Sequence, residues 1–482
     1  MAEQLLLPRA LEGFRVHLVG IKGTGMAALA EILWSRGARV TGSDTKEIFY
    51  TDVVLRRLSI PFVEGFAEEN LPADTQLVIH SAAYRRDENP ELIQATARGI
   101  PMIVYPQALG QLSLLSDSAG VSGVHGKSTT TAMCGVILKA WRMPATVLVG
   151  AEVPAFGDRS TLVQGDRYFV AETCEYRRHF LHFHPSRLLI TSVEPDHLDY
   201  FKDLDDLLSA FAEYGSLLPA GGRLVFCADE PGAVSAAERI LSRRNDVVPL
   251  QYGRTAQGPF RVVEESLGDG CSGFRLDGWP QRFTLKVPGA HSVLNAAGAV
   301  ALCSLLWEKE HHSLADLDLD SAASALGAFT GSRRRSEIVG GAGGILFMDD
   351  YGHHPTAIAT TLEGLRRFYP KRRLIVDFMS HTYSRTRALL HEFGQCFSSA
   401  DMVVLHRIYA SAREPNEGGI TGRDLFNEVS LHHHNVRYFE DPHEAIPFLT
   451  TELRSGDLFI TMGAGDNWKI GRDLQHVFGV RP

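Results

Sequence analysis

The chain has 482 residues, 44% of them hydrophobic, which exceeds what one core normally supports, so we expect about two to four domains. Acidic and basic residues are interspersed at a formal net charge of −9, which excludes the basic footprint of a nucleic-acid-binding protein. Because the chain has neither an apolar run long enough to span a bilayer nor a secretion signal at its start, we expect a cytoplasmic protein that does not bind membranes.

The first α/β unit begins with a strand at 16–19 and a glycine-rich turn at Gly20–Met26. The turn has the spacing G-x-x-G-x-G instead of the G-x-G-x-x-G of nicotinamide enzymes, and alone it specifies no ligand. A glycine loop at a helix N-terminus nevertheless suits a diphosphate. A later strand, 77–80, leads into a small-residue turn at Ser81–Ala83, where ligands of such sheets usually lie. We expect this first domain to end near residue 114.

The most informative segment is the loop Gly123–Ser128, which follows an apolar run and opens a hydroxyl-rich helix. Gly123 and Gly126 let backbone N–H groups turn toward an anion, and Lys127 adds a mobile positive charge. The pattern predicts a phosphate-binding loop. The usual spacing of such loops would place a further glycine at Val121, so this one is a variant.

Magnesium that accompanies a nucleotide needs hard oxygen ligands. The hydroxyl of Ser128 or Thr129 is placed to supply one. Glu172 and His197 each follow a predicted buried strand, so both should project from the sheet edge that carries the loop. Three other acidic residues nearby could equally well lie in solvated loops or cap helices without binding a metal. These are Glu175, Asp196 and Asp199.

Two further segments carry candidate ligand-binding residues. His291 and Asn295 open a long Ala/Leu-rich helix, where they can hydrogen-bond an adenine edge, although His291 can also be a capping residue. A third α/β unit begins near Gly331 with Arg333–Arg335, which form either a solvated basic patch or a hinge that reaches a transferring phosphoryl group. Every strand predicted in this unit ends in a polar segment, as a ligand-binding α/β domain requires.

The order of these motifs resembles the Mur ligase family over nearly the whole chain. The stretches D-D-Y-G-H-H-P-T and M-G-A-G-D are the most discriminating for the branch that adds L-alanine. The matching motifs are G-x-x-G-x-G-M at 20–26, G-V-H-G-K-S-T-T-T at 123–131, A-E at 171–172, E-P-D-H-x-D at 194–199, H-x-x-x-N at 291–295, G-S-R-R-R at 331–335, D-D-Y-G-H-H-P-T at 349–356, H-T-Y-S-R-T at 381–386 and M-G-A-G-D at 462–466.

The resemblance implies an α/β fold of three domains. These would be a Rossmann-like UDP-sugar domain at 1–114, a central P-loop ATPase-type domain at 115–330 and a Rossmann-like amino-acid-binding domain at 331–482. It also implies an ATP-dependent ligase of peptidoglycan precursor synthesis that joins L-alanine to the carboxylate of UDP-N-acetylmuramate through an acyl phosphate. ATP and two Mg²⁺ ions are expected, all substrates are small molecules, and the oligomeric state stays open.

Carried over position by position, the resemblance also implies a set of site residues. The UDP-sugar would contact Gly23, Thr24, Gly25, Met26, Ser81 and Ala82. ATP would contact Gly123, Val124, His125, Gly126, Lys127, Ser128, Thr129, His291, Asn295, Arg334, Arg335 and Asp350. The metal ligands would be Ser128, Thr129, Glu172 and His197, and the catalytic residues Lys127, Glu172, His197 and Arg334. The amino acid would lie among Tyr351, His353 and Arg385.

Three positions depart from the family's pattern. Cys174 stands in place of an acidic residue, Ser192 in place of an asparagine and Thr382 in place of an arginine. Because an amino acid's carboxylate normally pairs with a guanidinium, which Thr382 lacks, we expect Arg385 to be the clamp, with help from Arg387.

Two other functions compete with alanine ligation. One is the recycling branch of the family, which joins UDP-N-acetylmuramate to the peptide L-alanyl-γ-D-glutamyl-meso-diaminopimelate; Glu337 and the run 354–358 also suit it, but it needs a roomier pocket. The other is a non-catalytic nucleotide-binding module, against which the persistence of Lys127 and Glu172 argues. A nicotinamide dehydrogenase would leave the loop around Lys127 unexplained.

The cysteines and clustered histidines suggest no metal centre. The six cysteines lack any Cys-x-x-Cys spacing, so we expect reduced core thiols. We expect two histidine patches, His311–His312 and His432–His434, to be exposed loops, and no metal-binding partner for them is evident from the sequence.

Overall fold

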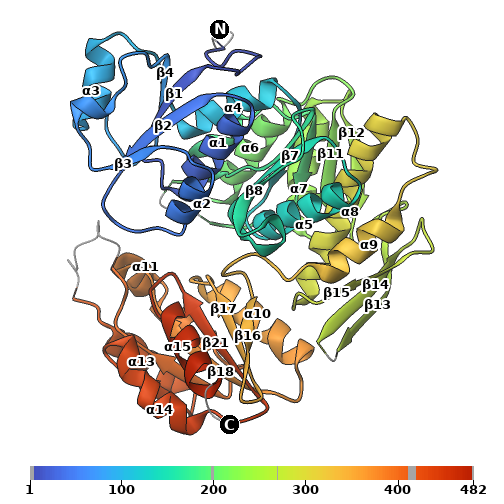
Figure 1. The fold of residues 1–482 in the computed structure, drawn as a ribbon. Helices are drawn as coiled ribbons and strands as arrows, with labels where there is room; N and C mark the ends of the chain where they lie inside the picture. The colour runs from blue at the N-terminus through green and yellow to red at the C-terminus, as the bar shows by residue number, and fades with distance from the viewer. Residues whose placement is uncertain (1–4, 197–199, 269, 411–418, 480–482) are drawn as a thin grey trace. The chain divides into compact units, whose positions relative to one another are not determined.

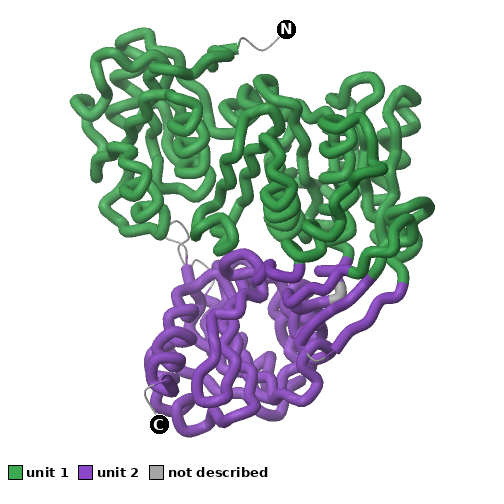
Figure 2. Tube along the Cα trace, turned by 45° about the vertical axis from the view of Figure 1, so that its right-hand side comes forward, with its two compact units in different colours: residues 1–263, 275–282, 294–326 green, residues 264–274, 283–293, 327–482 purple. Residues whose placement is uncertain are grey.

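The computed structural model describes residues 5–196, 200–268, 270–410 and 419–479 (Figure 1). The chain divides into two compact units (Figure 2). One comprises residues 1–263, 275–282 and 294–326, and the other residues 264–274, 283–293 and 327–482. Short 3-10 helices add to the main elements: η1 (Glu68–Asn70), η2 (Pro154–Phe156), η3 (Tyr176–His182) and η4 (Pro442–Glu444).

The first unit begins with a five-stranded parallel sheet in the order β3-β2-β1-β4-β5. The strand order reverses between β1 and β4, and this is where open α/β sheets bind ligands. The glycine-rich turn lies there, after β1. The strands are β1 (Arg15–Val19), β2 (Arg39–Asp44), β3 (Phe62–Glu64), β4 (Leu77–His80) and β5 (Met102–Val104). The helices are α1 (Thr24–Ser35), α2 (Thr51–Arg57), α3 (Pro90–Ala97) and α4 (Tyr105–Leu114).

A seven-stranded sheet in the order β12-β11-β10-β6-β9-β7-β8 follows in the same unit. It is parallel except for β8, which runs antiparallel to β7, and its central strand β6 leads into the phosphate-binding loop. The strands are β6 (Asp117–Ser122), β7 (Ala145–Val153), β8 (Arg159–Val163), β9 (Tyr168–Glu172), β10 (Arg187–Ile190), β11 (Arg223–Cys227) and β12 (Val248–Tyr252). The helices are α5 (Lys127–Ala140), α6 (Leu204–Gly215), α7 (Pro231–Arg243), α8 (Ala290–His311) and α9 (Leu319–Ala328).

A six-stranded sheet in the order β16-β17-β21-β18-β19-β20 forms the second unit, with only β16 antiparallel. Helices cover both of its faces, and each interface is a separate apolar cluster. The strands are β16 (Glu337–Ala342), β17 (Ile345–Asp350), β18 (Arg373–Met379), β19 (Met402–Leu405), β20 (Val436–Tyr438) and β21 (Asp457–Gly463). The helices are α10 (Pro355–Phe368), α11 (Tyr383–Ala388), α12 (Leu390–Gln395), α13 (Gly422–His432), α14 (Ala445–Glu452) and α15 (Trp468–Gly479).

The predicted α/β class with Rossmann-like parallel sheets is confirmed. A three-stranded sheet that was not predicted is formed by β13 (Val262–Gly268), β14 (Cys271–Leu276) and β15 (Arg282–Leu285). The histidine patches were predicted to be exposed loops, and this is only partly right. His311, His312, His432 and His434 are exposed, but His311 and His432 each end a helix and His433 is buried. Within the described residues, the apolar helices fall short of what crossing a bilayer requires.

Candidate active site

The loop that we predict to bind phosphate, Gly123–Ser128, connects the end of β6 to the first turn of α5. Gly123 and Gly126 have φ angles of +133° and +83°, which side-chain-bearing residues rarely adopt. A Cβ atom on Gly126 would lie 2.5 Å from Oδ1 of Asn295, and one on Gly123 would overlap Thr191. Both glycines are therefore required by backbone conformation and by lack of space.

Residues at the end of β10 hold the loop in place. The Oγ of Ser192 accepts a hydrogen bond from the His125 N–H at 2.9 Å, and the Ser192 carbonyl accepts one from Val124 at 2.9 Å. Thr191 Oγ1 donates to the carbonyls of Ser122 and His125 at 3.1 and 2.5 Å. Ser192, which departs from the family's asparagine, thus still binds the loop through its side chain.

Lys127 makes a buried ion pair at the start of α5. Its Nζ lies 3.0 and 3.1 Å from the two carboxylate oxygens of Glu175 and also donates to the carbonyls of Gly123 and Val124. Glu175 is 1% exposed. Burial by itself lowers the pKa of Lys127, but the negative charge of Glu175 outweighs it and raises the pKa overall, so the amine is fully protonated at neutral pH. Glu175 is therefore the ion-pair partner of Lys127, a role that its position in the sequence does not reveal.

Glu172 lies beside the loop because β9 pairs with β6, with Glu172 opposite Val121. Its carboxylate accepts the N–H of Gly150 at 2.7 Å. Partial desolvation and the charge of Glu175 raise the pKa of the neighbouring Cys174 thiol to about 11, so Cys174 stays neutral and does not replace the carboxylate that the family has there.

The residues around the loop fit a magnesium–nucleotide complex. The hydroxyls of Ser128 and Thr129 and the carboxylate of Glu172 are the hard oxygen donors that Mg²⁺ prefers. Among the described residues, Ser122 Oγ and Thr130 Oγ1 are buried hydroxyls without a hydrogen-bond partner on either side of this loop. The fourth predicted metal ligand, His197, lies outside the described residues.

The predicted nucleotide-facing pair sits in the first turns of α8. Asn295 is buried against Gly126, and within the part of the chain that the structure describes its Nδ2 has no hydrogen-bond partner. A buried amide donor without a partner costs roughly 1–3 kcal/mol unless a ligand satisfies it. His291, one turn earlier, is exposed.

The predicted UDP-sugar residues lie at the carboxyl ends of β1 and β4. Gly23 precedes α1, and a Cβ on Gly25 would lie 2.7 Å from Cζ of Tyr105, so the small residue is needed there. Asp44 stands at the end of β2, where nicotinamide enzymes bind a ribose, but its carboxylate accepts the Lys22 N–H at 2.6 Å and the Tyr84 hydroxyl at 3.2 Å. These internal bonds argue further against a nicotinamide site. The other predicted UDP-sugar residues at these two strand ends are Thr24, Met26, Ser81 and Ala82.

In the second unit, hydrogen bonds made by Arg334 and Asp350 hold the segment between Ser332 and Gly352 in place. Arg334 Nε lies 2.9 Å from Asp349 Oδ2, and its Nη2 donates to the Gly463 carbonyl at 2.6 Å. Asp350 accepts the N–H groups of Ser336 and Gly352, each at 2.6 Å. Burial raises the pKa of Asp349 to about 6, although the charge of Arg334 opposes this.

The three predicted amino-acid-binding residues lie close together in this unit. The rings of Tyr351 and His353 are 5.1 Å apart, and those of His353 and His381 are 6.0 Å apart. Arg385 Nη1 lies 3.4 Å from His381 Nδ1. The guanidinium groups of Arg334 and Arg335 lie 5.2 and 5.6 Å from the centre of the Tyr351 ring. Burial, the charge of Arg385 and His381 lower the pKa of His353 to about 4.

We expect His353 to make folding stability depend on pH. Because its folded-state pKa lies below that of a free imidazole, the unfolded chain binds a proton that the folded chain refuses, and stability falls as pH drops from about 6.5 to about 4. His353→Gln should flatten this part of the profile. Urea unfolding of both proteins from pH 7 to pH 4 checks it. Asp349 has a raised pKa, so it increases folding stability as pH falls from about 6 to about 4. Only the difference in stability between wild type and His353→Gln therefore reports on His353. Parallel stability–pH profiles for the two proteins would contradict the expectation.

Three family models match consecutive parts of the chain. They are the Mur ligase family catalytic domain at residues 15–116, the Mur ligase middle domain at 121–303 and the Mur ligase glutamate ligase domain at 334–465. A UDP-N-acetylmuramate–L-alanine ligase of Treponema pallidum (strain Nichols) is 49% identical over 472 residues, which cover 98% of each chain. The chain belongs to the Mur ligase family.

Further relatives of this Mur ligase carry the same name. A UDP-N-acetylmuramate–L-alanine ligase of Desulfitobacterium hafniense (strain Y51) is 40% identical and covers 95% of this chain and 99% of its own. Among solved structures, a UDP-N-acetylmuramate–alanine ligase of Thermotoga maritima superposes with a TM-score of 0.76 at 26% identity. The match covers 96% of this chain and 99% of that one. A murein peptide ligase of Psychrobacter arcticus, with a TM-score of 0.65 at 22% identity, shares the fold.

In this Mur ligase, Ser192→Ala is expected to raise the KM for ATP roughly fivefold with little change in kcat. The variant loses one hydrogen bond to the loop, typically worth about 1 kcal/mol. Ser192→Asn, which restores the family's residue and its hydrogen-bonding group, should keep the KM near the wild-type value. Steady-state kinetics at varied ATP measure both variants, and equal KM values in the alanine variant and wild type would show that Ser192 does not hold the loop.

Proposed function

We propose that this Mur ligase uses ATP to join L-alanine to the carboxylate of UDP-N-acetylmuramate in peptidoglycan precursor synthesis. The observation that carries the proposal is the near-full-length likeness, at 49% identity, to a relative with that activity in its name. The recycling reaction with a peptide is less favoured, because a structure named for ligation of that peptide is only 25% identical and covers only 67% of this chain. The substrates, a UDP-sugar and ATP, favour the cytoplasm as the site of the reaction.

The reaction proceeds in two steps. A carboxylate oxygen of UDP-N-acetylmuramate attacks the γ-phosphorus of ATP, the bond to the bridging oxygen of ADP breaks, and an acyl phosphate forms. The amine of L-alanine then attacks the acyl carbon, loses a proton and expels phosphate to leave the amide. The first step brings two anions together, so it requires positive charge around the transferring phosphoryl group.

The loop residues would supply much of that charge. Gly123, Val124, His125 and Gly126 would direct backbone N–H groups at the phosphates, and Lys127 would leave Glu175 for the β- and γ-phosphates. Ser128, Thr129 and Glu172 would hold Mg²⁺, which when bound neutralises phosphate charge and polarises the γ-phosphoryl group. We also propose a second Mg²⁺ ion, for which His197 would be one of the ligands. Asn295, with His291, would face the adenine.

The other groups of residues would hold the remaining substrates. The glycine turn at the start of α1 and the small-residue turn after β4 would bind the UDP-sugar diphosphate. Arg385 would clamp the carboxylate of L-alanine beside Tyr351 and His353, and the low pKa of His353 keeps that imidazole neutral. Arg334 and Arg335 would stabilise the phosphates, and Asp350 would fix the hinge or contact the ribose.

We further propose three functional domains within the two compact units. The sheet containing β1 would form the UDP-sugar domain at 1–114, the sheet containing β6 the ATP domain at 115–330, and the sheet containing β17 the amino-acid domain at 331–482. In support, α4 ends at Leu114, β6 begins at Asp117 and β16 begins at Glu337.

An ATPase assay with defined acceptors tests the proposed substrate. The purified chain is given ATP, Mg²⁺ and UDP-N-acetylmuramate, with L-alanine, L-serine, glycine or the tripeptide added separately, and ADP release and amide product are measured. The proposal predicts turnover with L-alanine and little with the tripeptide. Faster turnover with the tripeptide would support the recycling reaction, and no turnover with any acceptor would support a non-catalytic module.

A further inference from the structure

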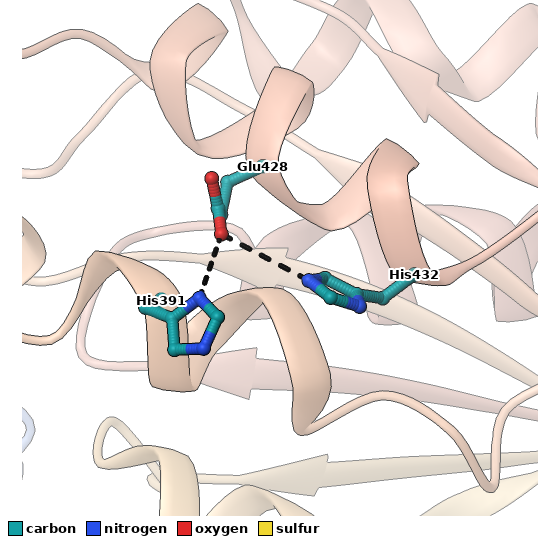
Figure 3. A group of neighbouring side chains, drawn as sticks. All are labelled: His391, Glu428 and His432. Atoms are coloured by element: carbon teal, nitrogen blue, oxygen red, sulfur yellow. Dashed lines mark hydrogen bonds and ion pairs between the residues drawn. The ribbon is translucent and has the colours of Figure 1, made fainter.

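Two histidines and a glutamate that lie far apart in the sequence converge on the surface of the second unit (Figure 3). His391 comes from α12, and Glu428 and His432 come from α13, one turn apart on the same face. Figure 3 shows all three side chains pointing toward one another. His391 Nδ1 lies 3.2 Å from Glu428 Oε1, which lies 3.9 Å from His432 Nε2. All three ligand atoms fall within 4.8 Å of one another.

The three ligand atoms are close enough together to surround one tetrahedral zinc ion after small side-chain movements. With metal–ligand bonds of about 2.0–2.1 Å, neighbouring ligand atoms of a tetrahedral site are about 3.3 Å apart. The spacing of His391 and Glu428 meets this value, and that of Glu428 and His432 exceeds it by about 0.6 Å. The spacing of the two imidazole nitrogens, which is at most 4.8 Å, needs the largest adjustment, and exposed side chains can make it. We infer that His391, Glu428 and His432 bind a zinc-class divalent cation, with water as the fourth ligand.

The helices that carry the ligands are fixed by the core. Phe393 of α12 and Val429 of α13 are fully buried in the same apolar cluster. Gly394 allows the close approach of the two helices, because a Cβ there would lie 2.9 Å from Glu428 Cγ and 3.0 Å from His432 Cδ2. The backbone positions of the three ligands are therefore set before any cation binds, which lowers the entropic cost of binding.

The chemistry of the ligands distinguishes this site from the magnesium site of the proposed reaction. Two imidazoles and one carboxylate suit Zn²⁺, whereas Mg²⁺ prefers oxygen ligands only. The side chains of His391, Glu428 and His432 are 71%, 21% and 37% exposed, so a hydrated cation can reach them. The Gln395 amide nitrogen Nε2 lies 2.9 Å from His391 Nε2. With the amide turned over, its oxygen would instead accept the Nε2–H of His391, which leaves Nδ1 to bind the metal.

A zinc titration of the full chain tests the site. The protein is stripped with EDTA, returned to buffer with excess Mg²⁺ to saturate the oxygen-ligand sites, and titrated with Zn²⁺ against a chromophoric chelator. Wild type should bind one more equivalent of Zn²⁺ than His391→Ala or His432→Ala. If the variants keep some affinity, their dissociation constant for Zn²⁺ should be at least roughly tenfold to hundredfold higher, because losing a residue that only supports a metal ligand already has an effect of that size. When Co²⁺ replaces Zn²⁺, wild type should show the visible absorption of a tetrahedral Co²⁺ complex, and His391→Ala and His432→Ala should not.

The matched control is His443→Ala, which removes an exposed histidine, 52% exposed, that pairs with Asp441 elsewhere on the same unit. This variant should bind Zn²⁺ like wild type. Equal zinc binding by all four proteins, or none by wild type, would overturn the inference. Far-UV circular dichroism and ligation activity in Mg²⁺ alone should be the same for all four, so a failure of this site is distinguishable from a failure of the proposed reaction.

Discussion

Lys127→Ala should lower ATP-dependent ligation by about 10³-fold or more, the loss typical of removing a charge that stabilises a phosphoryl-transfer transition state. The ammonium group at the start of α5 is the one cation that the structure places within the phosphate-binding loop among the described residues. ADP release and amide formation, measured at saturating substrates, both report the loss. Cys174→Ala, which changes a neutral side chain beside the same carboxylates, should retain nearly full activity.

A second pair of variants separates lost chemistry from lost folding. Lys127→Ala removes the cation that pairs with the buried carboxylate of Glu175, and breaking a buried ion pair in this way typically costs roughly 3–5 kcal/mol. The double variant Lys127→Met/Glu175→Gln removes both charges, so it should unfold at a higher urea concentration than the single variant while remaining inactive. Phosphate release at the wild-type rate in either folded variant would contradict the assigned role of Lys127.

Arg385→Ala should raise the KM for L-alanine by about two orders of magnitude and leave the KM for ATP nearly unchanged. A guanidinium that pairs with a substrate carboxylate contributes roughly 2–5 kcal/mol, and Thr382 cannot take its place. Arg385→Lys should recover part of the loss, because a lysine keeps the charge but not the two-pronged geometry. Initial rates at varied L-alanine measure the effect.

The control for this prediction is Arg423→Ala, which removes an arginine stacked 4.7 Å from the Tyr438 ring, elsewhere on the same unit. Its KM for L-alanine should stay at the wild-type value. An unchanged KM in Arg385→Ala would show that another group binds the carboxylate. Arg387, on the same short helix, would then be the next residue to replace.

The conformation of the glycine loop and the parallel sheets were predictable because they depend on local signals. Gly123, Gly126 and Lys127 are adjacent in the sequence, and the buried strands on either side are short apolar runs. Parallel pairing then brings Glu172 to the same sheet edge, since β9 lies beside β6. The carboxyl ends of β17 and β21 are brought together in the same way.

Residues whose roles depend on distant partners were not predictable. Glu175 follows a strand like many solvated carboxylates, and only the fold buries it against Lys127. Lys22 lies in a glycine-rich turn, where a lysine normally contacts phosphate. In the structure, however, its amine is buried, 3.3 Å from Asp52 and 3.1 Å from Glu64. The small sheet of β13–β15 was missed although β15 (Arg282–Leu285) alternates polar and apolar residues, which is the signal of a half-buried strand.

The histidine patch shows the same limit. The sequence places His432 beside two other histidines and suggests an exposed loop, whereas the partners that make it a metal ligand are Glu428 on the same helix and His391 on another. The contact between α12 and α13 depends on packing of Phe393 against the core and on the missing side chain of Gly394. These are tertiary effects that a linear pattern does not carry.

The central claim is that the carboxylate of UDP-N-acetylmuramate attacks ATP at the loop that contains Lys127. The most direct test follows oxygen: the sugar-nucleotide is labelled with ¹⁸O in both carboxylate oxygens, and the released phosphate and the amide are analysed by mass spectrometry. An acyl phosphate mechanism predicts one ¹⁸O atom in phosphate and one in the amide for each turnover. Phosphate without ¹⁸O would contradict it, since the carboxylate would then never have been phosphorylated.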